Sequence, residues 1–387
     1  MKRICRIIIM TIISLVCFVI PYTIFGEIDY IKEKKSIDNS LPTENEIDVF
    51  NDLLSENTMY YYNQLDENDK KSYVAIYSSF MSFDESVVVQ TDEKTLNNLF
   101  MAVLYDNPHI FWIEHQYEYV INKSSLKLIP KYCYNETEAK IISEQINKKI
   151  EQIVSAADKL SDDFEKELYI HDYVCLNTVY DDAVDGNSVY DVLIKGRAVC
   201  EGYSKTIQIL LDALDIDNYL VTGESVYEGE LGPHMWNIVN IDGMNYHLDS
   251  TWNDNDKDNE IHYFYFNVSD SVISEDHFSI FPFDNNCISD SAYYYSYNNS
   301  VFSDFNGFYE HTERSAEILR NGENEVEFIF ENSDDYENAI LYIENNKGFF
   351  NYVCEAGRKS GRKINTTKIS YITIKEHNYL SVIFKEG

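Results

Sequence analysis

A cysteine, a histidine and an aspartate in the middle of the chain have the side chains that nucleophilic catalysis by a thiolate requires. Cys200 directly precedes an apolar pattern with helical spacing, which predicts that it lies in the first turn of a helix. Backbone N–H groups and the helix dipole favour a thiolate at that position. A thiolate also needs a proton acceptor and a group that orients this acceptor, and His234 and Asp249 are the candidates.

Residues 234–252 predict a hairpin that would bring His234 and Asp249 together. Two strand patterns, HMWNIVNI and NYHLDSTW, are joined by Asp242-Gly243, a strong signal for a two-residue turn. In this register His234 and Asp249 are diagonal neighbours on one face of the sheet. A slip of one residue would separate them, and His247, on the same face as Asp249, is the competing histidine.

Each of these residues also has a structural interpretation. Free cysteines are among the most buried residues and pack as small apolar groups, and a lone histidine in a strand is more often a surface or core residue than a catalytic one. His171 and Asp172 could suggest a second acid and base pair, but adjacent positions of a helix point apart, so we expect His171 to pack in the core.

The motifs around these residues resemble those of the transglutaminase-like superfamily in its bacterial exported form. They are YIHDYVCLNTVYD, GRAVCEGYSKTIQILLDALDI, LVTGES and GPHMWNIVNIDGMNYHLDSTWND, which retain the order and spacing of that family over about residues 160–285. The resemblance implies a papain-like α+β core of N-terminal helices and an antiparallel sheet. It implies Cys200 as nucleophile, His234 as general base and acid, and Asp249 as the residue that orients His234, and leaves His247 a supporting role.

The sequence points less specifically to the residues of the oxyanion site and of the substrate pocket. The backbone N–H of Cys200 is expected to stabilise the oxyanion, and the candidates for a second donor or for pocket walls are Tyr180, Tyr190, Trp236, Glu201 and Gly202, with ordinary packing as the alternative. Glu201-Gly202 stands where animal transglutaminases have an aromatic residue. Because neither an EF-hand pattern nor a zinc-like spacing of Cys and His occurs in the sequence, we expect no metal and no cofactor.

The rest of the chain divides into further segments. The predicted order is an export segment at 1–26, a linker at 27–45, a small α+β module with a long helix at 46–160, the catalytic core at 161–285 and a small all-β unit at 298–387. A helix is expected to begin at Asn135 with Glu138 completing its cap, and Ser161 is expected to cap the next one. Cys133, Cys175, Cys200, Cys287 and Cys354 follow the export segment, and this odd number predicts at least one unpaired thiol.

The first residues indicate export. Lys2, Arg3 and Arg6 precede an apolar run at residues 7–25, which is typical of a secretory signal or of an uncleaved anchor. We expect cleavage after Gly26, with an anchor as the alternative, and therefore a secreted or surface-anchored protein that contacts membrane only through this segment. Removing residues 1–26 takes away three of the 31 basic residues and none of the 66 acidic ones, which leaves a net charge of about −38. Nucleic acid is therefore not an expected partner.

Three classes of function follow. The first is an exported cysteine acyltransferase or peptidase acting on amide bonds of proteins or of peptides such as those of the cell wall, with water or an amine as acceptor. The second is a cell-surface module that binds peptides or mediates adhesion without turnover. The third is a structural cell-surface protein.

Overall fold

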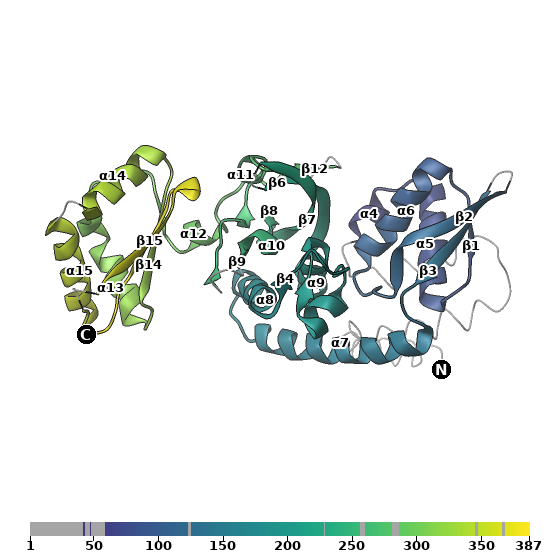
Figure 1. Ribbon diagram of the computed structural model, residues 1–387, viewed down its shortest axis with the longest axis horizontal. Helices are drawn as coiled ribbons and strands as arrows, with labels where there is room; N and C mark the ends of the chain where they lie inside the picture. The colour runs from purple at the N-terminus through teal and green to yellow at the C-terminus, as the bar shows by residue number, and fades with distance from the viewer. Residues whose placement is uncertain are drawn as a thin grey trace, which may run out of the picture. The chain divides into compact units, whose positions relative to one another are not determined.

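The computed structural model describes residues 42, 47, 59–122, 125–227, 229–255, 260–280, 286–344, 347–365 and 368–387. They form two compact units, one ending at Ser289 and the other beginning at Asp290 (Figure 1). Each unit mixes helices and strands, so the predicted α+β class is confirmed. The predicted export segment at residues 1–26 lies outside the described residues. None of the helices in the described part of the chain combines the length and apolar character that crossing a membrane requires.

The first unit opens with a small module of helices and sheet. Its elements are α4 (Tyr60–Asn63), α5 (Glu67–Ser82), α6 (Glu93–Asp106) and an antiparallel sheet in the order β1 (Val87–Val89), β3 (Ser125–Tyr132), β2 (Ile113–Asn122). The carboxylates of Asp66 and Asp92 accept backbone N–H groups of the first turns, which explains where α5 and α6 begin. Phe80, Phe100 and Trp112 are fully buried between helices and sheet.

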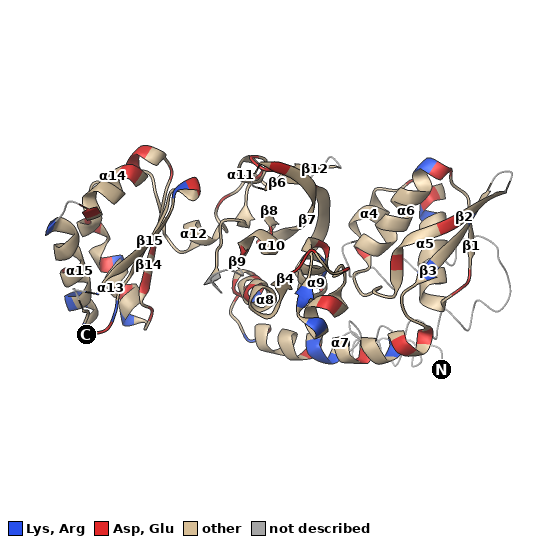
Figure 2. Ribbon diagram, viewed as in Figure 1, with Lys and Arg blue, Asp and Glu red and all other residues tan. Residues whose placement is uncertain are grey.

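Two longer helices lead into the core of the first unit. The predicted capping box at Asn135 and Glu138 is confirmed, and it starts α7 (Glu136–Ala157). Basic and acidic residues are interspersed along this helix (Figure 2). The next helix, α8 (Asp163–Asn177), is capped by Asp162 and not by Ser161 as predicted. The reason is that the Asp162 carboxylate accepts the N–H of Glu165 at 2.9 Å, whereas the Ser161 hydroxyl donates to Asp162 itself.

The core pairs a helix with a five-stranded sheet. The helix is α9 (Cys200–Asp212), whose apolar residues Ile207, Leu210 and Leu211 are fully buried. The sheet is antiparallel, with the order β11 (Phe266–Val268), β8 (Met244–Leu248), β7 (Glu230–Ile241), β6 (Asn218–Tyr227), β12 (His277–Ser279). Short elements connect these layers: β4 (Val179–Tyr180), a π-helical turn η1 (Asp191–Lys195), β5 (Arg197–Ala198), α10 (Ser250–Asn253), β9 (Asp254–Asn255), β10 (Glu260–Ile261) and α11 (Asp270–Ile273).

The second unit is not all-β, as the sequence had suggested. Its sheet has the order β13 (Val301–Phe302), β14 (Glu325–Phe330), β16 (Tyr379–Ile383), β15 (Ser370–Ile374). Its helical elements are α12 (Tyr294–Tyr297), η2 (Phe308–His311), α13 (Thr312–Arg320), α14 (Ser333–Glu344), α15 (Lys347–Ser360) and η3 (Lys375–His377).

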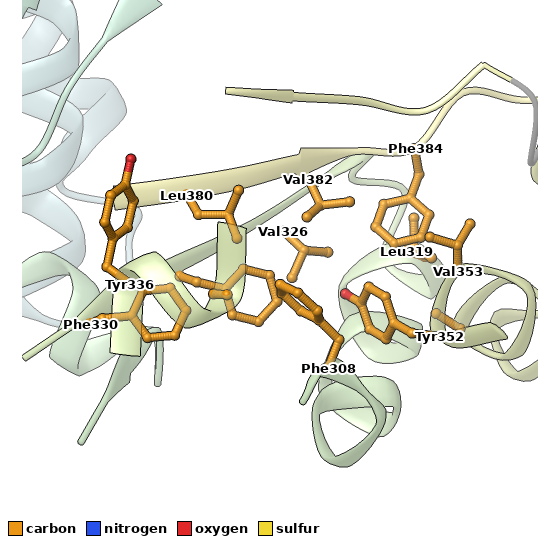
Figure 3. Close-up of a cluster of buried hydrophobic side chains, with 13 residues drawn as sticks. Phe308, Leu319, Val326, Phe330, Tyr336, Tyr352, Val353, Leu380, Val382 and Phe384 are labelled. Atoms are coloured by element: carbon orange, nitrogen blue, oxygen red, sulfur yellow. The ribbon is translucent and has the colours of Figure 1, made fainter. Parts of the chain in front are cut away.

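The segment ENAILYIEN, whose composition favours a strand, lies mostly in α14. The side chain of Asn332 accepts the N–H of Asp335 at 2.9 Å and so caps this helix, and the helical spacing of Tyr336 and Ala339 buries both in the unit's core. Figure 3 shows this core, in which Phe308 and Tyr352 pack against the sheet residues Val326 and Val382. Tertiary burial therefore decides between helix and strand here.

Candidate active site

Cys200 is the first residue of α9 and is half-buried, with a free thiol. A left-handed turn at Gly196, with φ of 68°, and the short strand β5 lead the chain into the helix. Val199 occupies the N-cap position, where a valine side chain offers no hydrogen-bond acceptor to the first turn. The predicted placement of the thiol at a helix N-terminus is confirmed, and the dipole of α9 favours negative charge at this position.

His234 and Asp249 meet as the hairpin register predicts. The pairs from Ile241 and Met244 to Asn237 and Leu248 all have residue numbers that add up to 485. The imidazole Nε2 of His234, on β7, lies 2.7 Å from Oδ2 of Asp249. One detail of the prediction is wrong, because the strand ends at Leu248 instead of running through residue 252.

The strand ends there because Asp249 caps the short helix α10. Its Oδ1 accepts the backbone N–H groups of Thr251 at 2.9 Å and Trp252 at 3.1 Å. The carboxylate is fully buried, so these two bonds hold it rigidly while Oδ2 faces the imidazole. Asp249 therefore both ends the strand and orients His234.

The charges of the three side chains are coupled. Cys200 lies near enough to His234 to favour the charged form of its imidazole. Because Nε2 of His234 is bound to Asp249, the other ring nitrogen, Nδ1, is the one available to the thiol. Burial alone would lower the pKa of His234, but the charge and hydrogen bond of Asp249 and the contact with Cys200 outweigh burial and raise that pKa to about 10. Burial likewise opposes ionisation of Asp249, and its two histidine partners overcome this and lower its pKa. The arrangement favours an imidazolium at His234.

A second histidine, not identified from the sequence, binds the same carboxylate. Nε2 of His277, at the start of β12, lies 3.0 Å from Oδ2 of Asp249, and the imidazole is completely buried. Its Nδ1 lies 2.5 Å from Oδ1 of Asp276. The ring centroids of His277 and His234 are 5.2 Å apart.

Trp236 supports the site but is not the oxyanion donor that the sequence had suggested. Its indole is buried and stacks on His234, with ring centroids 6.1 Å apart. Its Nε1–H donates to Nδ1 of His247 at 3.0 Å, so this donor is already engaged. His247 has the supporting role that the family resemblance implies. It accepts the hydrogen bond of the Trp236 indole, and its Nε2 lies 2.9 Å from Oδ1 of Asp270.

The other predicted pocket residues separate into two groups. Tyr180, on β4, lies within electrostatic range of the thiol: burial and then the charge of Cys200 raise its pKa, and the residue is 43% exposed. Tyr190 instead packs against Phe111 and Tyr134, with the ammonium of Lys195 over its ring. The structure therefore brings Tyr180, but not Tyr190, to the nucleophile.

Glu201 and Gly202 stabilise and pack the first turn of α9. The carboxylate of Glu201 lies 2.7 Å from Nζ of the buried Lys205 and 3.3 Å from Nε2 of His115, which comes from the N-terminal module. The N–H of Gly202 donates to the carbonyl of Val199 at 2.9 Å, which leaves it unavailable to an oxyanion. A Cβ at Gly202 would lie 2.5 Å from the carbonyl oxygen of Gly186, so only glycine fits.

His171 is fully buried in α8, as predicted, but it does not point away from Asp172. Its Nδ1 lies 2.9 Å from Oδ1 of Asp172, and its Nε2 lies 3.1 Å from Nδ2 of Asn253. The Asp172 side chain bends back along the helix surface to reach the ring. These contacts connect α8 to α10, and so support the helix that Asp249 caps.

Two clusters among the described residues contain the atom types of a metal site, His234 with Asp249 and His277, and His247 with Asp270 and Cys287. In the first cluster, hydrogen bonds account for the approach of both imidazoles to one oxygen. In the second, the Trp236 N–H binds Nδ1 of His247, so a neutral ring carries its proton on Nε2. A metal-bound histidine usually has the opposite arrangement, with its second nitrogen as a donor.

A family model covers the residues of this site. Residues 151–252, which include Cys200, His234 and Asp249, match the family model of the transglutaminase-like superfamily. A comparison with curated proteins found no match. A solved structure of a TGase is 18% identical, with 43% of this chain and 50% of that chain covered and a TM-score of 0.25.

A second solved structure, described as a "Putative Cysteine Protease from Cytophaga hutchinsonii", is 14% identical, with 35% of this chain and 61% of that chain covered and a TM-score of 0.25. The matches thus span between half and two thirds of the length of these two structures. The family match and the motifs identify residues 151–252 of this chain as a transglutaminase-like domain.

Proposed function

We propose that this protein is a cysteine enzyme that acts on amide bonds of proteins or peptides through a thioester intermediate. The observation that carries the proposal is the buried hydrogen bond between His234 and Asp249, with Cys200 at the N-terminus of α9 near enough to His234 to raise the pKa of its imidazole. The family match supports the coarser statement, an enzyme of transglutaminase-like type. A module that only bound peptide would have no need of this arrangement of sulfur, imidazole and carboxylate.

In the first half of the reaction, the thiolate of Cys200 attacks the carbonyl carbon of an amide. A carbon–sulfur bond forms, and the carbon–nitrogen bond breaks as the imidazolium of His234 gives its proton to the leaving nitrogen. The products are a thioester, a free amine or ammonia, and a neutral His234. Asp249 keeps the imidazole oriented and stabilises its charged form before this transfer.

In the second half, an acceptor attacks the thioester carbon while His234 takes its proton, and the carbon–sulfur bond breaks to restore the thiolate. Water as acceptor gives peptide cleavage or deamidation, and a lysine amine gives a cross-link. The backbone N–H of Cys200, at the start of α9, is the proposed donor to the oxyanion. Tyr180, exposed and within electrostatic range of the thiol, is the proposed wall for the substrate.

The test is incubation of the protein with a fluorescent primary amine and a glutamine-containing protein, and separately with that protein alone. Incorporation of the amine indicates transamidation, and new peptide termini without incorporation indicate a protease. Either product should be lost in Cys200→Ala and kept in Cys133→Ala, a matched control that removes an exposed cysteine elsewhere in the same unit. If a thiol-directed probe labels Cys200 no faster in the folded protein than in denatured protein, the enzyme proposal is wrong.

Export is part of the proposal and is supported by the basic and apolar start of the chain. The substrate would then be an extracytoplasmic protein or peptide, including those of the cell wall. The test is expression in a bacterium, followed by fractionation and mass measurement. A mature mass that starts after Gly26 supports a cleaved signal, an uncleaved chain in the membrane fraction supports an anchor, and a cytoplasmic full-length chain contradicts export.

A further inference from the structure

His277 occupies a position from which it can act on the catalytic pair through Asp249. It lies on the edge strand β12 opposite Ser225 of β6, and His234 lies on β7 opposite Gly223 of the same strand. Opposed residues share a face of the sheet, so both histidines stand on the same face, with β6 between them. Because Gly223 and Ser225 are small, the two imidazoles can lean toward each other over β6, and both reach Oδ2 of Asp249.

The hydrogen bonds of His277 determine its protonation. Each ring nitrogen faces a carboxylate oxygen, Asp249 at 3.0 Å and Asp276 at 2.5 Å. An ionised carboxylate only accepts, whereas a neutral imidazole has a single N–H and can donate to only one partner. The second oxygen of Asp276 accepts the hydroxyl of Tyr265 at 2.5 Å, so both oxygens of this carboxylate serve as acceptors. Both nitrogens of His277 therefore carry protons.

We propose that His277 is a positively charged positioning residue that holds Asp249 in place and sets the pH range in which the Cys200 and His234 ion pair exists. This inference concerns Cys200 and His234, the reactive pair of the proposed function. Its effect on amide turnover depends on that proposed function. The family resemblance implies Cys200, His234 and Asp249 as site residues, and His277 is a fourth.

The surroundings of His277 agree with a buried cation. Burial alone would lower the pKa of His277, but the hydrogen bonds of Asp249 and Asp276 outweigh burial and raise it. The other charged group facing it is His234, which opposes its protonation, and its own charge in turn lowers the pKa of His247. Aromatic rings also surround it, with centroid distances of 4.5 Å to Trp252, 5.1 Å to Trp236 and 5.3 Å to Tyr265.

The charge of His277 has a definite effect on His234. Two like charges oppose each other, so a charged His277 keeps the pKa of His234 lower than Asp249 and Cys200 alone would make it. Removing that charge should therefore let the ion pair persist to higher pH. At a ring separation of 5.2 Å, and with the opposite charge of Asp276 cancelling part of the effect, we expect a shift of about one pH unit.

The experiment measures the rate at which iodoacetate alkylates Cys200 in the full-length chain as a function of pH, in a Cys133→Ala background. Iodoacetate is an anion that the imidazolium of His234 attracts, so the rate falls on the basic limb when His234 loses its proton. Asp276→Asn offers an amide N–H to Nδ1, so His277 becomes neutral but still donates to Asp249. His277→Gln removes the cation and leaves the charge of Asp276 behind. The basic limb of the profile should rise by about one pH unit in Asp276→Asn and by more in His277→Gln.

The matched control is Asp270→Asn, which neutralises the aspartate of the other histidine pair, His247 and Asp270, and should leave the basic limb unchanged. A purely structural role for His277 would lower the rate equally at all pH values. Such a uniform loss, an unchanged profile, or a shift to lower pH would overturn the proposal. Circular dichroism of each variant establishes that the chain is folded.

A second measurement needs no variant to be active. In the unsubstituted chain, ¹⁵N NMR of the histidine rings at pH 7 should find both nitrogens of His277 protonated, with the signals assigned by their loss in His277→Gln. A single protonated nitrogen would overturn the proposal. Because alkylation and NMR involve no amide substrate, a chain without amide turnover but with the expected shifts would contradict the proposed function and leave the role of His277 intact.

Discussion

The substitution Asp249→Asn isolates the charge of the buried carboxylate. Asparagine is also a good N-cap, so its oxygen can still accept the N–H groups of Thr251 and Trp252 and keep α10 in place. What it removes is the negative charge that raises the pKa of His234 to about 10. If the contact with Cys200 continues to offset burial, this pKa returns to near its ordinary value of 6.5.

The size of the effect follows from this difference. At pH 8 a group with a pKa of 10 is almost fully protonated, whereas one with a pKa of 6.5 is about 3% protonated. The population of the ion pair should therefore fall about 30-fold at pH 8. The rate at which the anion iodoacetate alkylates Cys200 should fall with it, because the imidazolium that attracts this reagent is lost, and the basic limb should move down by roughly 3.5 pH units. Stopped-time alkylation between pH 5 and 10, with Asp270→Asn as control, measures both quantities. A rate at pH 8 within twofold of the unsubstituted protein would refute the coupling of Asp249 to His234.

Three further predictions address the surrounding structure. Gly202→Ala should lower the free energy of unfolding of the first unit, measured in denaturant, by more than about 2 kcal/mol, because its Cβ would lie 2.5 Å from the Gly186 oxygen. The control Gly232→Ala, whose Cβ would meet nothing within 4 Å, should change this free energy by less than about 0.5 kcal/mol. Trp236→Phe keeps the aromatic ring beneath His234 but leaves Nδ1 of His247 without its donor, so it should cost about 1–3 kcal/mol in the same measurement. A loss of turnover above about 100-fold would instead identify the indole as an oxyanion donor. Burial raises the pKa of Glu167 to about 8, so the folded state holds its proton while the unfolded state loses it, and thermal stability should fall as pH rises from about 4.5 to 8. Glu167→Gln should flatten this dependence, and an unchanged slope would contradict the assignment.

The hairpin that carries His234 could be predicted because its determinants are local. Asp242 and Gly243 both adopt positive φ angles, 53° and 78°, as a two-residue turn of this type requires. Such a turn fixes every pair along β7 and β8, and so places His234 beside Asp249 from the sequence alone. The start of α9 was equally local, because the apolar spacing after Cys200 could only be buried as a helix.

His277 could not be predicted because its position depends on a distant pairing. β12 pairs with β6 across a stretch that includes both strands of the hairpin, and no turn signal fixes that register. The adjacent Asp276 was the only local signal, and an aspartate next to a histidine is too common to indicate an ion pair. The strand predicted for the segment that forms α14 was wrong. Its β-branched and aromatic residues favour a strand, but burial in the core of the second unit requires a helical face.

Small residues on β6 allow His234, which a local turn places, to meet His277, which a distant strand pairing places. Neighbouring strands lie about 4.8 Å apart, so β7 and β12, with β6 between them, are separated by roughly 10 Å. The rings of His234 and His277 nevertheless lie 5.2 Å apart, which requires that the strand beneath them present little side chain. Gly223 meets this need most strictly, because a Cβ there would lie 2.4 Å from the carbonyl oxygen of Phe278 and 2.9 Å from the ring of Trp236. The motif LVTGES therefore carries information about the candidate site although it contains none of the three proposed catalytic residues: its glycine leaves the space in which a second imidazole can reach Asp249.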